Sequence, residues 1–260
     1  MIVAVAVILI VGTSAIISNF AKNETNTKIV TNETGSGKLG TGSGKLMEQP
    51  SATLPSNFTH GSSAIRVPAV DNDGNGVVTW LKVDSAVGEG RTLVNINQLL
   101  FWVDTQQSMQ IAKSVAQNYT GYDLSKVDII YTINTDASII EGPSAGAALT
   151  VATVSALYNK TIDPDVMITG TINPNGTIGS VGGILEKAKA AKDVGSKLFL
   201  VPVGQSSQTY YQQERNCEKI SYITYCTTDY KPVTINISEQ AGIEVKEVMS
   251  INAALKYFLS

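Results

Sequence analysis

Histidine and cysteine are scarce in this chain of 260 residues, which holds one histidine, His60, and two cysteines, Cys217 and Cys226. A Ser-His-Asp site needs a histidine beside its serine, and His60 lies in a polar stretch, PSNFTHGSS, that is typical of a linker. Two cysteines do not make a zinc site alone. The scarcity therefore argues against the common histidine-based hydrolases and against a zinc enzyme.

Charge is also low, with 16% charged residues and a formal net charge of −3. Nothing in that balance indicates a nucleic acid partner. The string GSGK occurs twice, at 35–38 and 42–45, within a repeated TGSGKL. Leu follows each lysine where a phosphate loop requires Ser or Thr, so we interpret the repeat as part of a tether. We expect no cofactor.

The segment DNDGNG at 71–76 matches the first half of a calcium-binding loop. Lys82 stands where such a loop requires a bidentate glutamate. The flanking residues have the pattern of strands, which favours a hairpin turn. We therefore predict no metal site.

The N-terminus contrasts with the rest of the chain, because residues 1–18 contain no charged side chain. We predict a membrane anchor or signal segment at 1–21, and favour an uncleaved anchor because no good Ala-x-Ala site follows. Residues 22–63 are rich in Gly, Ser and Thr, and we expect a flexible linker there.

Several features bear on the side of the membrane. Asn-x-Ser/Thr sequons favour an exported body, and the composition predicts about three by chance. Seven are present, at Asn23, Asn32, Asn57, Asn118, Asn159, Asn175 and Asn236. Cys217 and Cys226 are a candidate disulfide of an oxidising compartment, whereas Lys22 and Lys28 favour the opposite orientation. We expect a protein of the cell membrane with its folded domain outside.

From residue 64 the pattern becomes that of a folded domain. Helices are predicted at 105–119, 144–159, 184–194 and 250–259, with short strands between them. The strands and helices alternate without a regular βαβ repeat, so we predict one α+β domain with a mixed sheet and packed helices over 64–260. Residues 204–240, rich in Gln, Tyr, Thr and Ser, are predicted to be an insertion.

The segment GPSAG at 142–146 has the form of a nucleophile turn, but no histidine follows Ser144 to serve as its base. Lysine can replace histidine only when it is neutral, which requires burial. In the predicted helix GGILEKAKAAKDVG, Lys187 lies on the apolar stripe, and Lys189 and Lys192 lie on the polar face. Two interpretations of Lys187 remain open. Its amine is a buried base, or its side chain extends along the protein until the amine reaches the solvent.

Two segments together carry a resemblance to a known family. EGPSAGAALTVA begins at residue 141 and MITGTINPNGTIGSVGGILEKAKAA begins at 167, followed by an LVP strand. They resemble the proteolytic domain of Lon proteases. The resemblance covers about 64–203 and resumes at 241–260.

This resemblance implies a compact α+β domain with a Ser144–Lys187 catalytic dyad. It implies that Thr169 hydrogen-bonds the lysine and that Glu141 helps to orient the site. Backbone N–H groups of Ser144 and Ala145, at the positive end of a helix, are expected to stabilise the oxyanion. Polypeptide substrates and a homo-oligomer are implied in the same way.

Three departures from the family bear on function. The family normally carries an ATP-driven unfolding module before this domain, where we predict an anchor and tether. The insertion at 204–240 is not typical, and Asp often stands where this chain has Glu141. We therefore expect a membrane-anchored, ATP-independent serine endopeptidase. The alternatives are a catalytically inactive binding module of the same fold and, third, a phosphate-binding protein.

Overall fold

The computed structural model describes residues 53–259 apart from 96–99, 102, 135–138 and 141. The predicted anchor at 1–21 and most of the predicted linker lie outside the described residues. Within the described part of the chain, no helix is both long and apolar enough to cross a membrane.

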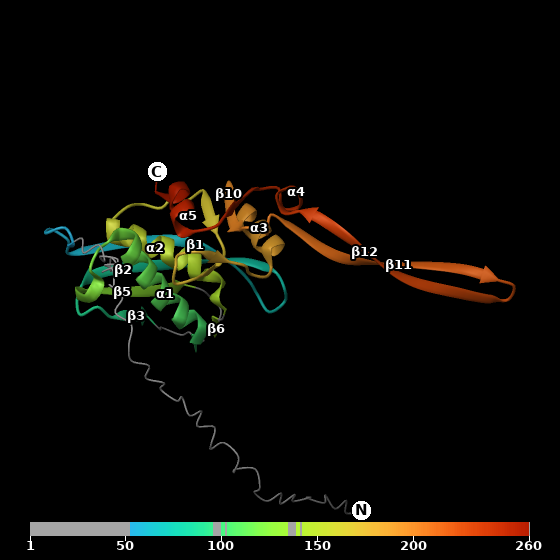
Figure 1. Ribbon diagram of the computed structural model, residues 1–260, viewed down its shortest axis with the longest axis horizontal. Helices are drawn as coiled ribbons and strands as arrows, with labels where there is room; N and C mark the ends of the chain where they lie inside the picture. The colour runs from blue at the N-terminus through green and yellow to red at the C-terminus, as the bar shows by residue number, and fades with distance from the viewer. Residues whose placement is uncertain (1–52, 96–99, 102, 135–138, 141, 260) are drawn as a thin grey trace, which may run out of the picture. The chain divides into compact units, whose positions relative to one another are not determined.

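The described residues form a mixture of strands and helices in the α+β manner that the sequence predicts (Figure 1). The strands are β1 (His60–Val70), β2 (Gly76–Val87), β3 (Thr92–Asn95), β4 (Leu100–Phe101), β5 (Val127–Asn134), β6 (Ile139–Ile140), β7 (Val166–Ile168), β8 (Thr171–Ile172), β9 (Ile178–Gly179), β10 (Leu198–Pro202), β11 (Ser207–Ile220), β12 (Ile223–Asn236) and β13 (Glu244–Val248). The helices are α1 (Val103–Thr120), α2 (Gly146–Tyr158), α3 (Ile184–Asp193), α4 (Ile237–Ala241) and α5 (Ile251–Phe258), with 3₁₀ turns η1 (Leu124–Lys126) and η2 (Pro143–Ala145).

Two sheets organise the domain. The first has the order β1-β2-β5-β3, in which β3 alone runs parallel to its neighbour and the other pairs are antiparallel. The second is parallel, with the order β13-β10-β7. The antiparallel pairing of β1 with β2 follows from the tight hairpin between them, since adjacent strands joined by a short turn must be antiparallel.

That hairpin turn is the predicted DNDGNG segment. The Asp71 carboxylate accepts hydrogen bonds from the backbone N–H groups of Asp73, at 3.0 Å, and Asn75, at 2.8 Å. An aspartate that bonds its own backbone in this way stabilises a turn without a metal ion. The carboxylate therefore has a structural role.

Helix α2 lies at the centre of the main core. Every residue from Gly146 to Leu157 is buried, and the helix packs against β1 and β2 on one side and α1 on the other (Figure 1). Its alanines and glycine allow this close approach from all sides, as expected for a helix that is apolar all round. The chain leaves the helix at Asn159, whose φ of 50° lies in the left-handed region that ends helices.

Helix α3 belongs to a second, smaller core. Ile184, Ala188 and Ala191 pack there with Met167 of β7 and Phe199 of β10. The next residue of β7, Ile168, faces the main core instead. Strand β7 therefore connects the two cores through the opposite faces of consecutive residues.

Two predicted boundaries differ from the structure. Strand β1 begins at His60, inside the predicted linker. The segment VMITGTI at 166–172, one of the short strands expected between the predicted helices, is divided into β7 and β8 by Thr169 and Gly170, because Gly170 adopts a φ of 150° that interrupts the strand.

The predicted insertion at 204–240 contains a two-stranded antiparallel ribbon, β11 and β12, which we call the arm (Figure 1). Cys217 and Cys226 face each other across the ribbon and form a disulfide. Helix α4 follows directly, and its first residue, Ile237, is fully buried in the smaller core.

Candidate active site

Ser144 lies in η2, the single turn that leads into helix α2. Gly142, two residues before it, has a φ of 92°, which only glycine adopts without strain. Pro143 then occupies the start of the turn, where its missing N–H is no loss. The Gly-Pro pair thus turns the chain sharply and leaves the Ser144 side chain half-buried at the helix N-terminus.

The break between β7 and β8 holds this turn in place. The N–H of Gly170 donates to the carbonyl oxygen of Ser144 at 3.0 Å, and the Thr169 hydroxyl donates to the same oxygen at 3.3 Å. The N–H of Ala147 donates in return to the carbonyl oxygen of Gly170 at 3.0 Å. These three bonds fix the serine turn against residues 169–170 on both sides.

Gly146 makes the close approach of helix and strand possible. A Cβ atom at this position would lie 2.6 Å from Ile172 Cγ2 and 2.8 Å from the Ile172 backbone nitrogen. Both distances are shorter than real Cβ contacts. The second glycine of GPSAG is therefore required by packing against β8.

Lys187 is buried in helix α3, with 4% of its surface exposed. Burial lowers the pKa of its amine to about 8, because the charged form loses its hydration. Among the described residues no carboxylate forms an ion pair with this amine. Lys189 and Lys192 are exposed, so the helix buries the lysine that the apolar stripe selects.

The start of α3 is packed tightly against the β1–β2 hairpin. A Cβ at Gly183, whose φ is 67°, would lie 2.5 Å from Val70 Cγ2, and a Cβ at Gly76 would lie 2.0 Å from the Glu186 carbonyl oxygen. The Lys187 N–H then donates to the Gly183 carbonyl oxygen at 3.0 Å, which makes it the first hydrogen bond of the helix. The glycines thus set the depth at which Lys187 enters the domain.

The structure places some of the predicted site residues beside Ser144 and leaves others untested. Thr169, which is 1% exposed, contacts the backbone of Ser144. The family resemblance predicts a hydrogen bond from Thr169 to the lysine, whereas its observed bond goes to the Ser144 carbonyl oxygen. Glu141 lies outside the described residues. Ala145 follows Ser144 in the same turn, at the positive end of α2.

Gly170 was not predicted to take part in the site. Its N–H and carbonyl groups both bond the serine turn. A glycine inside a strand pattern often marks a close approach of two backbones, so the TG pair within MITGTI is the feature that could have identified it.

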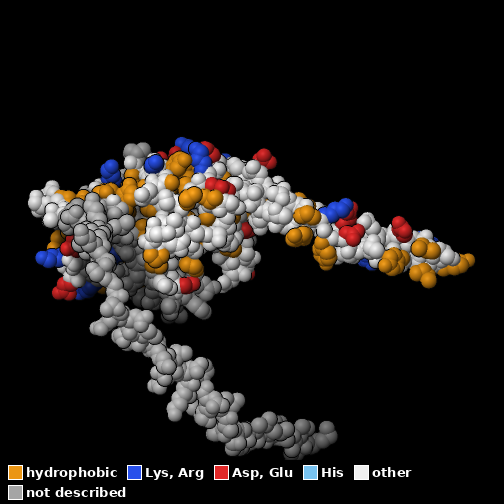
Figure 2. Space-filling model, viewed as in Figure 1, with side chains coloured by type: hydrophobic (Ala, Val, Ile, Leu, Met, Phe, Trp, Pro, Cys, Tyr) orange, Lys and Arg blue, Asp and Glu red, His pale blue; other side chains and the backbone are white. Residues whose placement is uncertain are grey.

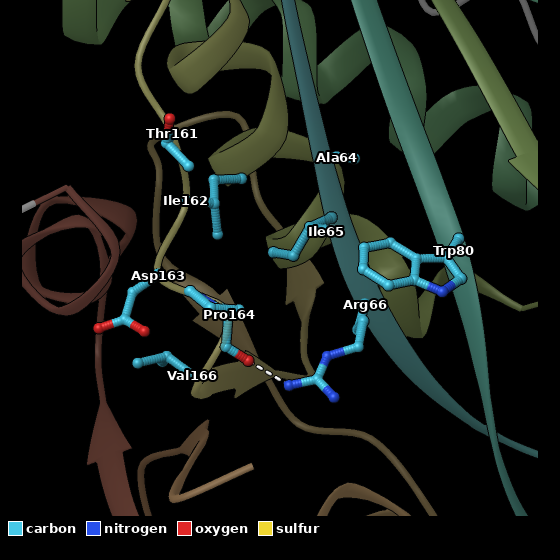
Figure 3. Close-up of a pocket in the computed structure, with 9 residues that line it drawn as sticks. All are labelled: Ala64, Ile65, Arg66, Trp80, Thr161, Ile162, Asp163, Pro164 and Val166. Carbon is cyan, nitrogen blue, oxygen red and sulfur yellow. Dashed lines mark hydrogen bonds between the residues drawn. The ribbon is translucent and has the colours of Figure 1, made fainter. Parts of the chain in front are cut away.

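A separate hollow of about 180 Å³ lies between β1 and the residues around Pro164 (Figure 3). The Arg66 guanidinium donates there to the carbonyl oxygens of Pro164 and Val194 and to the Ser196 hydroxyl. Neither Ser144 nor Lys187 lines this hollow. Because its cation is already bonded to the chain, we interpret it as a structural contact.

The sequence is similar to proteins of one known family. Residues 80–220 match the sequence profile of the Lon protease (S16) C-terminal proteolytic domain. The chain is 28% identical over 144 residues to an archaeal Lon protease of Thermococcus kodakarensis, and 25% identical over 188 residues to Lon protease 2 of Bacillus subtilis. It is 39% identical over 95 residues to a Lon protease of Buchnera aphidicola.

These alignments cover 55%, 68% and 36% of this chain but only 22%, 32% and 11% of the three relatives. The chain therefore spans less than a third of the relatives' length, and the family profile that it matches is that of the proteolytic domain. The matched residues 80–220 include Ser144, at the start of a buried helix, and Lys187, which is buried in the next helix. The chain belongs to the Lon protease family.

Proposed function

We propose that this protein is a serine endopeptidase in which Lys187 is the base for Ser144. The observation that carries the proposal is the burial of Lys187 at 4% exposure, with its pKa lowered to about 8. At pH 7.5 such an amine is neutral in about a quarter of molecules, against about one in a thousand for an ordinary lysine. Burial therefore supplies the base that the chain otherwise lacks.

The reaction is acyl transfer. The neutral Lys187 amine takes the proton of the Ser144 hydroxyl while the oxygen bonds to the carbonyl carbon of a peptide. The ammonium then returns the proton to the leaving amine as the C–N bond breaks. Water next attacks the carbonyl carbon of the ester while the Lys187 amine takes a proton from it, and the ammonium returns that proton to the Ser144 oxygen as the ester C–O bond breaks. The backbone N–H groups of Ser144 and Ala145, at the positive end of α2, support the oxyanion.

The proposal has two further parts. The cleavage does not depend on ATP, and the substrates are polypeptides in an unfolded state. Neither GSGK string has the Ser or Thr that a phosphate loop places after its lysine. In this proposal the site acts on chains that are already extended. Addition of Mg-ATP to a casein digestion is expected to leave the rate unchanged.

We also propose that residues 1–21 anchor the protein in the cell membrane with the peptidase domain outside. The Cys217–Cys226 disulfide supports an oxidising compartment. The sequon asparagines among the described residues are all exposed, namely Asn57, Asn118, Asn159, Asn175 and Asn236. A protease added to intact cells is expected to remove the domain, and protection until the cells are lysed would contradict this placement.

The peptidase proposal is tested by digestion of casein with the full chain and its Ser144→Ala and Lys187→Met variants. Both substitutions are expected to lower kcat/KM by at least about a thousandfold, since nucleophile and base act as one unit. Lys189→Met, on the exposed face of the same helix, is the matched control and should keep the parent rate. Equal cleavage by all four proteins would identify the activity as a contaminant and favour a binding module.

A further inference from the structure

The arm has no core of its own. Each of its strands has 14 residues, which gives a ribbon roughly 45 Å long. Every residue of the two strands is exposed except four that are half-buried, Glu214, Cys226, Val233 and Ile235. A two-stranded ribbon is marginally stable alone in water, so a ribbon of this length gains stability from any surface that covers it.

Large apolar side chains are exposed along the ribbon (Figure 2). Tyr211 is 71% exposed, Tyr222 99% and Ile223 72%, and Tyr230 is exposed to 64%. Soluble proteins rarely expose so many large apolar groups in one place unless the place is an interaction site. The arm therefore has the composition of a contact surface.

Charge is divided between the two faces of the ribbon. Residues paired directly across an antiparallel ribbon lie on the same face, so the unbroken register from Ser207↔Asn236 to Ile220↔Ile223 assigns every residue to one of two faces. Face A, defined by the even-numbered residues of β11 and the odd-numbered residues of β12, carries Glu214, Glu218, Asp229 and Lys231. Face B, the opposite face, carries Arg215 and Lys219.

All acidic side chains of the arm thus lie on face A, where Lys231 neutralises Glu214 in an ion pair. Face A keeps two negative charges, and face B has two positive ones. Two copies that met through the same face would oppose like charges, which is unfavourable. Two copies that meet through opposite faces pair opposite charges.

The register of the charges favours a parallel arrangement. Arg215 follows Glu214 in β11, and Lys219 follows Glu218. If two arms stack in parallel without a shift, each cation lies about 3.3 Å along the ribbon from an acid of the neighbouring arm. Both pairs are satisfied at once, whereas an antiparallel stack separates them.

From this we propose that the arm is a self-association surface, in which face A of one copy packs on face B of a second copy with the arms parallel. The contact is heterologous, so repetition of it builds a ring or an open helix. A face of roughly 45 by 10 Å buries on the order of 450 Å² per partner, below the ~800 Å² of a standard interface. We therefore expect a weak association that falls as salt rises.

An unfolded substrate or a lipid surface would also cover exposed tyrosines. Neither accounts for the division of charge between two faces, because a single partner of one chemistry would need only one of them. The division is what a surface requires when its partner is a copy of itself.

The test reverses one face at a time in the full chain, solubilised in mild detergent and followed by sedimentation velocity. The face A variant carries Glu218→Lys and Asp229→Lys, and the face B variant carries Arg215→Glu and Lys219→Glu, which leaves the Glu214–Lys231 pair intact. Each variant alone is expected to lose roughly tenfold or more in association constant. The two variants mixed, or all four changes in one chain, should restore association.

The matched control carries Asp73→Lys and Glu239→Lys, which change the net charge as the face A variant does but lie outside the arm on exposed residues. It should associate as the parent does, and casein digestion by each variant reports that the domain is folded. Association unchanged by either reversed face, or lost in both and not restored on mixing, would overturn the proposal. So would loss of casein or vesicle binding in the arm variants while the oligomer persists.

Discussion

At the scale of single residues, hydrogen bonding distinguishes two lysines whose pKa is lowered by burial. The Lys113 amine donates to the carbonyl oxygens of Gly90, Arg91 and Val127, and burial lowers its pKa. That amine is held by acceptors and joins a loop to β5. Lys187 has burial as the sole cause of its shift, which leaves its lone pair available to a serine.

The rate of peptide cleavage should therefore depend on the charge of Lys187. We expect kcat/KM to rise tenfold per pH unit below about 8 and to level above it, because only the neutral amine accepts a proton. The measurement is a pH profile of fluorogenic peptide cleavage from pH 6 to 9.5. A flat profile across this range would exclude Lys187 as the titrating base.

Stability should respond to the same group. The folded-state pKa of about 8 lies below that of an exposed lysine, so between the two values the unfolded chain binds more protons and stability rises with pH. Below pH 8 the charged amine is buried at a disadvantage on the order of 3 kcal/mol. Lys187→Met should thus raise the free energy of unfolding at pH 7 by up to about this amount.

Urea unfolding at pH 7 and at pH 9.5 measures this difference. The gain in stability from Lys187→Met should shrink between pH 8 and 10.5. In this range the wild-type amine is neutral in the folded state and still charged in the unfolded state. Lys189→Met, on the exposed side, should show no such dependence. A gain that is equal at both pH values would mean that packing, and not charge, is responsible.

At the scale of elements, the serine turn depends on the contact between α2 and β8. Gly146→Ala would place a methyl group 2.6 Å from Ile172 Cγ2, and overpacking of this kind costs about 1–3 kcal/mol. Alanine gains at most ~1 kcal/mol in helix propensity, so the cost of overpacking should exceed this gain. We expect a net loss of roughly 1–2 kcal/mol in urea unfolding, together with slower cleavage.

Gly182→Ala is the matched control, because no atom lies within 4 Å of a Cβ at that position. It should change stability by less than about 0.5 kcal/mol. If Gly146→Ala behaved in the same way, β8 would not hold the serine turn in the manner described.

At the scale of the whole molecule, the arm and the folded core are separable. Ser207 and Asn236 are register partners at the base of the ribbon, so a short Gly-Ser turn can replace residues 208–235. The main core draws nothing from the arm, whose strands contribute only Ile235, at its base, to the smaller core. We expect the melting temperature to fall by no more than roughly 2–4 °C, the equivalent of about 1 kcal/mol.

The same arm-less protein should still cleave a short peptide, since Ser144, Thr169 and Lys187 lie outside the replaced segment. Differential scanning calorimetry measures the change in melting temperature, and a peptide cleavage assay measures the retained activity. Loss of folding on removal of the arm would mean that the ribbon is part of the core and not an appendage.

The sequence by itself determined the local features of this protein. The apolar stripe of GGILEKAKAAKDVG selected Lys187 over Lys189 and Lys192, and the hydrophobic pattern after Ser144 predicted a helix at 144–159. The turn at 71–76 followed from Asp, Asn and Gly. Such signals lie within one or two turns of chain, where periodicity and backbone preference act.

Only the tertiary structure decided how distant segments meet. The two donors to the Ser144 carbonyl oxygen come from Thr169 and Gly170, in a break within what the sequence presented as one strand. The strand order β1-β2-β5-β3 was also beyond prediction, and so was the length of the two 14-residue strands within the predicted insertion. These features depend on contacts between residues far apart in the chain, and such contacts leave no periodic trace in either partner alone.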